Sequence, residues 1–431
     1  MVYIHVPYCR SFCTYCGFYS EIPGKGFGRF TDALCAEISY RRNEIAASCR
    51  CCNFVCTQES GGCAAGPDGH AYGSRDFRSN TLYIGGGTPS ILPLSDLERI
   101  VETVGEAAGL PLSGELPFDE FTVEVNPDDI VSKGPGYVEG LLSLGVNRVS
   151  MGVQAMDDNV LKWMNRRHDV ETARKAYRII SSAGIGNISI DLIFGYALDA
   201  AGGPGHWEKT VSDALSIAGD GTVPKHISAY QLSVDEGSAL AGMVASGRYV
   251  EAPDEQCAQQ YAVLCSLLAD AGYRHYEISN FAQPGYEAKH NSAYWNHVPY
   301  VGLGPAAHSF SGSGPGMSPR RTWNHEDTMA YISAAENGDW SRAASGETLD
   351  GRQLREEEIM LSLRTDKGIS RKYLEMDRDI VPSICRFLSS GSLVPVDPET
   401  MEYYGLPAGE ERLRIPEERF FVSDDIISEL L

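Results

Sequence analysis

The sequence is poor in basic residues and has no long apolar run. Its 36 lysines and arginines stand against 58 aspartates and glutamates, which gives a formal net charge of −22 at pH 7. Sequence-independent affinity for nucleic acid comes from clustered positive charge, so this composition argues against a nucleic-acid partner. No stretch reaches the roughly 18 consecutive apolar residues that are typical of a membrane-spanning helix.

We also expect no secretion signal, because the first apolar, β-branched run already begins at Val2. The 12 cysteines are therefore expected in a reducing compartment, where metal chemistry is more common than disulfide formation. These features together predict a cytoplasmic protein.

Three cysteines follow the first predicted strand at close spacing. Cys9, Cys13 and Cys16 form a Cys-x3-Cys-x2-Cys motif. Each thiolate can hold one iron of a [4Fe–4S] cluster, which leaves the fourth iron to a ligand from outside the protein. A purely structural metal site is normally closed, so an open position predicts reactivity.

A zinc site and a set of buried free thiols are the alternatives for these cysteines. Zinc would require a fourth Cys or His at ordinary spacing. The next cysteine, Cys35, lies far along a predicted helix, and His5 lies too close in sequence to complete a tetrahedron. The spacing therefore favours the cluster.

Apolar, β-branched runs alternate with amphipathic helical stretches through the first half of the chain. This alternation predicts a parallel sheet with right-handed crossovers, and six such units can form an incomplete barrel. The predicted strands are Val2–Val6, Leu82–Gly85, Phe121–Val125, Arg148–Val153, Asn187–Ile193 and His226–Leu232. The predicted helices are Asp32–Ile45, Ser95–Gly105, Asp157–Asn165, Val170–Ala183 and Lys209–Ala218.

Polar and glycine-rich motifs lie near the carboxyl ends of these predicted strands. They include the Gly85–Thr88 segment, Glu124, Gln154, Asp191 and Ala229. Ligands bind at that edge of α/β barrels and open sheets, so we expect one shared site. A buried ion pair is the alternative for the two carboxylates. The glycine segment is not a phosphate loop, because no Gly-Lys-Ser/Thr follows it.

The motifs resemble those of the oxygen-independent coproporphyrinogen III oxidase superfamily and, within it, the HemW family of haem chaperones. They occur in family order over most of the chain. The shared segments are Tyr3-Ile-His-Val-Pro-Tyr-Cys9, Gly85-Gly-Gly-Thr-Pro-Ser90, Glu124-Val-Asn-Pro127, Asn147-Arg-Val-Ser-Met-Gly-Val-Gln154, Asn165-Arg-Arg-His168, Ile190-Asp-Leu-Ile193, His226-Ile-Ser-Ala-Tyr230, Tyr276-Glu-Ile-Ser-Asn-Phe281, His290-Asn-Ser-Ala-Tyr-Trp295 and Gly302-Leu-Gly-Pro-Ala-Ala-His-Ser309.

This resemblance implies a fold, two cofactors and a set of site residues. The fold is an α/β, radical S-adenosylmethionine (SAM) partial (β/α)6 barrel over residues 1–315, with a small mainly helical C-terminal domain over residues 316–431 that is similar to that of the oxidases. The three motif cysteines would hold the [4Fe–4S] cluster, and SAM would bind the fourth iron. The residues implied to line the SAM site are Tyr3, Tyr15, Gly86, Gly87, Thr88, Glu124, Gln154, Arg166, Asp191 and Ala229.

Two features favour the chaperone over the oxidase. The oxidases carry one more cysteine two positions after the third, where this chain has Phe18, and they have a longer segment before the cluster motif. The segment that begins at His290 is similar to a haem-binding motif of the HemW family, which implies His290 as a haem ligand. A hydrogen-bonded structural histidine is the alternative for His290.

The resemblance therefore implies haem as cargo and delivery to haem-accepting apoproteins, which can include membrane-associated ones. The alternatives are an oxygen-independent coproporphyrinogen III oxidase and a radical SAM enzyme for another small molecule. Cleavage of SAM, the second axial ligand of the haem and the oligomeric state stay open.

One segment fits none of the expected elements. Residues 46–80 contain Cys49, Cys51, Cys52, Cys56 and Cys63 where only a short helix-to-strand link is needed, so they are interpreted as an insertion. A second metal site is one interpretation, and a loop with free thiols is the favoured one.

Overall fold

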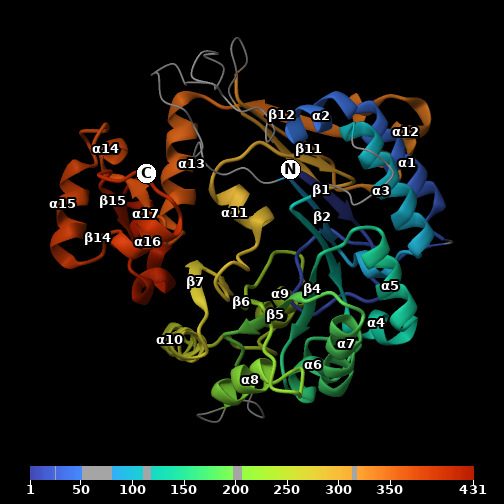
Figure 1. Cartoon of the computed structure of the whole chain (residues 1–431), viewed down its shortest axis with the longest axis horizontal. Coiled ribbons are helices and arrows are strands. Elements are labelled where there is room, and N and C mark those ends of the chain that lie inside the picture. Colours follow the sequence, from blue (N-terminus) through green and yellow to red (C-terminus); the bar gives the residue numbers. More distant parts are fainter. Residues whose placement is uncertain (25, 51–79, 110–117, 198–205, 313–317) are drawn as a thin grey trace.

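The protein is built around one nine-stranded sheet with strand order β7-β8-β6-β5-β4-β3-β2-β1-β9 (Figure 1). The computed structural model describes residues 1–24, 26–50, 80–109, 118–197, 206–312 and 318–431. The central strands are β1 (Val2–Val6), β2 (Thr81–Gly86), β3 (Glu120–Val125), β4 (Arg148–Gln154), β5 (Asn187–Phe194) and β6 (His226–Gln231).

These six strands are parallel neighbours in chain order. Such sequential order is that of barrel winding, whereas a doubly wound sheet reverses its direction at a switch point. The predicted α/β fold with six parallel units is therefore confirmed.

Three short strands extend this sheet at both ends. They are β7 (Arg274–Glu277), β8 (Asn280–Ala282) and β9 (Val301–Leu303). β9 runs parallel to β1, whereas β8 is antiparallel to β6 and β7 is antiparallel to β8. Strands this short leave no periodic pattern in the sequence, and none of the three was predicted.

Helices connect the parallel strands. They are α1 (Gly28–Tyr40), α2 (Arg42–Arg50), α3 (Leu94–Ala108), α4 (Pro127–Lys133), α5 (Pro135–Ser143), α6 (Asp158–Trp163), α7 (Val170–Ser182) and α8 (His206–Leu215), with a 3-10 turn η1 (Pro89–Ile91) before α3. The single helix predicted over Asp32–Ile45 is in fact two, α1 and α2. Two further helices, α4 and α5, begin at prolines and were not predicted, although proline suits a first helical position because the N–H it lacks has no intrahelical partner there.

The segment between β6 and the C-terminal region adds further helices and a second, three-stranded sheet. Its elements are α9 (Ala239–Ala245), α10 (Asp254–Asp270), α11 (Lys289–Trp295), β10 (His308–Ser311), β11 (Arg320–Asn324), α12 (Thr328–Asn337), η2 (Trp340–Arg342) and β12 (Ala344–Thr348). β10, β11 and β12 form one antiparallel sheet, and α12 lies beside α1 (Figure 1). This sheet joins residues on both sides of the expected division at 315/316, so that division stays a prediction.

The remaining elements gather on one side of the molecule (Figure 1). They are α13 (Gly351–Leu363), β13 (Ile369–Ser370), α14 (Arg371–Leu374), α15 (Val381–Ser390), β14 (Val394–Pro395), α16 (Pro398–Tyr403), β15 (Arg412–Arg414), η3 (Glu417–Val422) and α17 (Ser423–Ser428). The C-terminal region is mainly helical, as predicted. β15 ends at Arg414, since Pro416 cannot donate to a sheet and a 3-10 helix follows it.

Two further observations concern the sequence-based expectations. Within the described ranges, no helix combines the length and the apolarity needed to cross a bilayer. Cys49 is buried at the end of α2, whereas Cys51, Cys52, Cys56 and Cys63 lie outside the described residues.

Candidate functional site

A cavity of about 1150 Å³ lies at the carboxyl ends of the central strands. Most of the residues predicted to form the site line it together. They are Cys9, Cys13, Tyr15, Cys16, Gly86, Gly87, Thr88, Glu124, Gln154, Arg166 and Asp191. Side chains far apart in the sequence thus converge because parallel strands end at the same edge of the sheet.

The cysteine loop is fixed at its base and along its length by hydrogen bonds. The Cys9 N–H donates to the Glu21 carbonyl over 3.0 Å, which closes the loop directly after β1. The Thr14 N–H donates to the Met164 carbonyl over 3.1 Å, and its hydroxyl donates to the Trp163 carbonyl over 2.8 Å. The turn after α6 therefore holds the loop that carries the three thiols.

The three thiols share this cavity, and none of them forms a disulfide. The Cys9 Sγ lies 3.3 Å from the Thr88 hydroxyl, and Arg166 Nη1 donates to the Cys13 Sγ over 3.3 Å. Burial raises the pKa of Cys16 to about 11, so this sulfur keeps its proton at neutral pH in the absence of a cation. A bound metal would favour the thiolate.

Arg166 connects the cysteine loop to the central sheet. It is half-buried, and its Nη2 donates to the Asn126 side-chain oxygen over 2.6 Å and to the Gly152 carbonyl over 2.7 Å. Its Nε is buried without a hydrogen-bond partner. That donor can serve an anionic group in the cavity, such as a carboxylate.

The glycine segment packs against the cysteine loop. A Cβ at Gly87 would lie 2.8 Å from the Tyr8 carbonyl oxygen. Gly86 has φ +103°, and the Gly87 N–H donates to the Val6 carbonyl over 2.8 Å. Glycine is required here because two backbones approach each other directly before Cys9.

Two half-buried carboxylates face the cavity, and their hydrogen-bond donors are neutral groups. Glu124 accepts from the Tyr83 hydroxyl over 2.7 Å and from the Gly86 N–H over 3.1 Å, while Asp191 accepts from the Ser150 hydroxyl over 3.1 Å. Burial raises the pKa of Glu124 to about 7 and that of Asp191 to about 6, against the opposing effect of the Arg148 guanidinium. None of the ion pairs found among the described residues joins Arg148 to either carboxylate.

This donor set fits a [4Fe–4S] cluster and SAM. Three thiols lie at one part of the cavity, and the two carboxylates provide uncompensated acceptors for a cationic amino group or for ribose hydroxyls. The orphaned Nε of Arg166 provides a donor for a carboxylate. The buried-ion-pair interpretation of Glu124 and Asp191 receives no support from this geometry.

Tyr3 and Ala229 lie outside the lining of this cavity. The Tyr3 hydroxyl is hydrogen-bonded to His5 Nδ1 over 3.0 Å, and burial raises the pKa of Tyr3. The Ala229 side chain is buried in the hydrophobic core, and its N–H donates to the Ser279 carbonyl over 2.8 Å. Their assignment to SAM binding stays a prediction.

His290 is also outside the cavity, and both of its ring nitrogens have partners. Nδ1 is 2.8 Å from the Thr81 hydroxyl and Nε2 is 3.1 Å from the Tyr294 hydroxyl. The residue is 1% exposed, and its ring lies against that of Tyr83 at 5.0 Å. This geometry matches a hydrogen-bonded structural histidine, and ligation of haem iron would require one of these hydrogen bonds to break.

Several cavity residues were missed by sequence reasoning. Tyr83, Asn126, Ser150 and Tyr230 line the cavity, as does Arg148. The available signal for Arg148 was a charged residue in an otherwise apolar strand, and the structure shows that this residue is buried. Asp235 also lines the cavity, from the loop after β6, and no motif marks it.

Comparisons with known proteins identify the family of the chain. The model of the radical SAM superfamily matches residues 71–198. The chain is 30% identical to the haem chaperone HemW of Bacillus subtilis, over 91% of this chain and 92% of that protein. It is also 30% identical to a mitochondrial radical SAM domain-containing protein 1 of Bos taurus, over 86% of this chain and 74% of that protein.

The fold is shared with a solved structure, that of coproporphyrinogen III oxidase (HemN) from Escherichia coli. The TM-score is 0.71 at 17% sequence identity, with 100% of this chain and 89% of that chain covered. At this identity the likeness concerns the fold alone. Because the similarity to the Bacillus subtilis chaperone extends over nearly the full length of both proteins, the chain belongs to the HemW family of haem chaperones.

Proposed function

We propose that this protein binds haem as cargo and delivers it to haem-requiring apoproteins, with a [4Fe–4S] cluster and SAM as resident cofactors. The observation that carries the proposal is the 30% identity to the Bacillus subtilis haem chaperone over 91% of this chain. The recipients would be apoproteins that need haem, including membrane-associated ones.

The cavity supplies ligands for both cofactors. Cys9, Cys13 and Cys16 would hold the cluster, and Arg166 would keep Cys13 in place through its 3.3 Å contact. Glu124 and Asp191 would accept hydrogen bonds from the cationic and hydroxyl groups of SAM. A bound cluster of this type supplies one-electron chemistry to SAM.

The competing function is oxygen-independent oxidation of coproporphyrinogen III. The likeness to the Escherichia coli oxidase supports it at the level of the fold. Against it stands Phe18, at the position where the oxidases carry a further cysteine. Its side chain is 77% exposed at the cavity, and the described lining contains only the three motif cysteines.

Turnover distinguishes the two functions. Protein reconstituted anaerobically with its cluster is incubated with SAM, a strong reductant and coproporphyrinogen III, and protoporphyrinogen is followed over time. We expect no repeated turnover, with the cluster intact and SAM bound. Multiple turnovers would overturn the proposed function and make the protein an oxidase that works without the further cysteine.

A further inference from the structure

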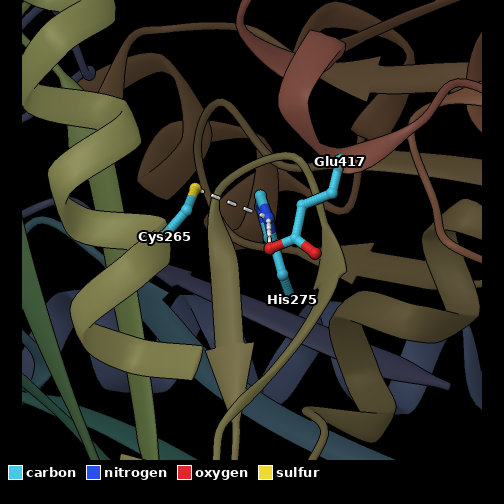
Figure 2. A group of neighbouring side chains, drawn as sticks. All are labelled: Cys265, His275 and Glu417. Atoms are coloured by element: carbon cyan, nitrogen blue, oxygen red, sulfur yellow. Dashed lines mark hydrogen bonds and ion pairs between the residues drawn. The ribbon is translucent and has the colours of Figure 1, made fainter. Parts of the chain in front are cut away.

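A second group of metal-ligating side chains lies away from the cavity, between the barrel and the C-terminal region. Cys265 belongs to α10, His275 to β7 and Glu417 begins η3. One ligand atom from each lies within 4.8 Å of the other two. Figure 2 shows the sulfur and the carboxylate both directed at the imidazole ring.

The two measured separations suit a tetrahedral ion. His275 Nδ1 lies 3.8 Å from the Cys265 Sγ and 3.0 Å from Glu417 Oε1. Zinc bonds of about 2.3 Å to sulfur and about 2.0–2.2 Å to nitrogen and oxygen place such ligand atoms roughly 3.4–3.6 Å apart. These two separations need shifts of only a few tenths of an ångström, and the sulfur lies within 4.8 Å of the carboxylate oxygen.

The hydrogen bonds of Tyr261 determine which nitrogen of His275 carries the proton. The Tyr261 hydroxyl donates to the Ile278 carbonyl over 2.7 Å, so its hydrogen is already used. The 3.1 Å contact between this oxygen and His275 Nε2 therefore requires Nε2 to donate. A neutral His275 then has its lone pair on Nδ1, which faces the other two ligands.

This arrangement brings two acceptors together. The Nδ1 lone pair and the Glu417 oxygen lie 3.0 Å apart, and only a cation between them makes such an approach favourable. That cation is either a proton, held by the imidazole or by the carboxylate, or a metal ion. The Cys265 sulfur lies 3.8 Å from the same nitrogen and is a soft donor that a proton-sharing pair would not need.

The surroundings resemble those of a built metal site. The His275 side chain is 2% exposed, and its ring is stacked on Phe281 at 4.0 Å. The Glu417 side chain is 45% exposed, so an ion and a fourth, water ligand have access from solvent. A histidine ligand whose second nitrogen is held by a hydrogen-bond partner is the usual arrangement around protein-bound metals.

We propose that Cys265, His275 and Glu417 bind a zinc ion that joins the barrel to the C-terminal region. One sulfur, one imidazole and one carboxylate are ligands that zinc accepts in tetrahedral sites. This site is separate from the cluster and SAM cavity, and it does not depend on the proposed haem function.

The test is a zinc titration of the full-length, cluster-loaded protein in competition with a chromophoric zinc chelator. The iron cluster then occupies Cys9, Cys13 and Cys16, and any zinc bound elsewhere is common to all variants. We expect the wild type to bind one more equivalent than Cys265→Ser, and Glu417→Gln to bind that equivalent at least about tenfold more weakly. Tyr261→Phe, which frees Nε2, should weaken binding by about 10–100-fold.

Two of the three ligands have a matched control residue on the same element or next in the sequence. Cys257→Ser changes another cysteine of α10, and Glu418→Gln changes the exposed neighbour of Glu417. Both should bind zinc as the wild type does. Replacement of zinc by cobalt should give a sulfur-to-cobalt charge-transfer band that Cys265→Ser loses.

Equal zinc stoichiometry and affinity in the wild type, Cys265→Ser and Glu417→Gln would overturn the proposal. The trio would then be a hydrogen-bonded histidine–carboxylate pair beside a half-buried thiol. Glu417→Gln keeps the test decisive if His275 variants fail to fold, because the Glu417 side chain is half-exposed.

Discussion

Single residues in the cavity combine two tasks, since they hold the local structure and present groups to a ligand. Glu124 is the clearest case. Its two oxygens accept from Tyr83 and from the backbone of Gly86, yet burial raises its pKa to about 7, since the Arg148 guanidinium opposes this only in part and no cation among the described residues forms an ion pair with it. A ligand with a positive group would supply that cation.

Glu124→Gln therefore tests this residue in SAM binding. The amide can still accept from the Gly86 N–H and donate to the Tyr83 oxygen, so the fold should be kept. We expect SAM affinity to fall by about 10–100-fold, which corresponds to the loss of a charge-assisted hydrogen bond. Equilibrium binding of SAM to cluster-loaded protein measures this, with iron content as the control. Unchanged affinity at full iron content would remove Glu124 from the SAM site.

His290→Ala separates a structural role from haem ligation. With both ring nitrogens hydrogen-bonded in the core, we expect a loss of roughly 2–3 kcal/mol in stability and no change in the Soret band of bound haem. Chemical denaturation and the absorption spectrum measure the two effects. A changed Soret band with unchanged stability would instead support the ligand role that the family resemblance implies.

At the scale of elements, the site depends on contact between two loops. The glycine segment after β2 lies against the backbone that enters the cysteine loop after β1. The turn after α6 holds the other side of that loop through hydrogen bonds to Thr14. The positions of the thiols are thus set by segments distant in sequence.

Gly87→Ala should disturb the cluster site without unfolding the sheet. The added methyl group would meet the Tyr8 carbonyl at 2.8 Å and displace the residue before Cys9. We expect at least a twofold loss of reconstituted iron per chain, measured together with the cluster absorbance. Gly136→Ala in α5 is the matched control, because nothing lies within 4 Å of its added Cβ and alanine favours a helix. Equal iron content in both variants would contradict this account.

The sequence predicted elements wherever burial leaves a long pattern. The six central strands were predictable because they are buried and therefore read as continuous apolar runs. α4 and α5 were not, because each is short and a proline separates them from the preceding segment. The three residues of β9 pair with β1 through tertiary context alone.

The same limits apply to the candidate site. Glu124, Gln154 and Asp191 could be predicted as site residues because each is a polar residue near the end of an apolar strand. Arg148 was overlooked because a strand-initial arginine is usually exposed, whereas here it is buried and lines the cavity. The hydrogen bonds that join His290 to Thr81 and Tyr294 depend on packing between α11 and β2, which no local sequence pattern encodes.

For the whole molecule, buried charge links stability to pH. Glu277 is buried and Glu124 and Asp191 are half-buried, and desolvation raises the pKa of all three, that of Glu277 to about 7. Each native carboxyl group holds its proton at a pH where the unfolded chain has lost it. Ionisation of these three carboxyl groups is therefore less favourable in the folded protein than in the unfolded chain.

The cofactor-free protein should consequently lose stability as pH rises from about 4 to about 7. In this window the native state binds more protons than the unfolded state, so the free energy of unfolding falls with increasing pH. Glu277→Gln removes the carboxyl group with the raised pKa, and it should therefore reduce this decline in the free energy of unfolding by up to roughly 3 kcal/mol. Denaturation curves at a series of pH values measure it, and an identical pH slope in wild type and variant would contradict the prediction.

The central claim is that the protein carries haem, and haem transfer tests it most directly. Full-length, cluster-loaded protein is titrated anaerobically with haem while the Soret band is followed, and apomyoglobin is then added as a haem-free recipient. The account predicts saturable binding of haem to the chain and its complete movement to apomyoglobin. Binding that does not saturate, or haem that stays unspecifically associated after apomyoglobin is added, would contradict it.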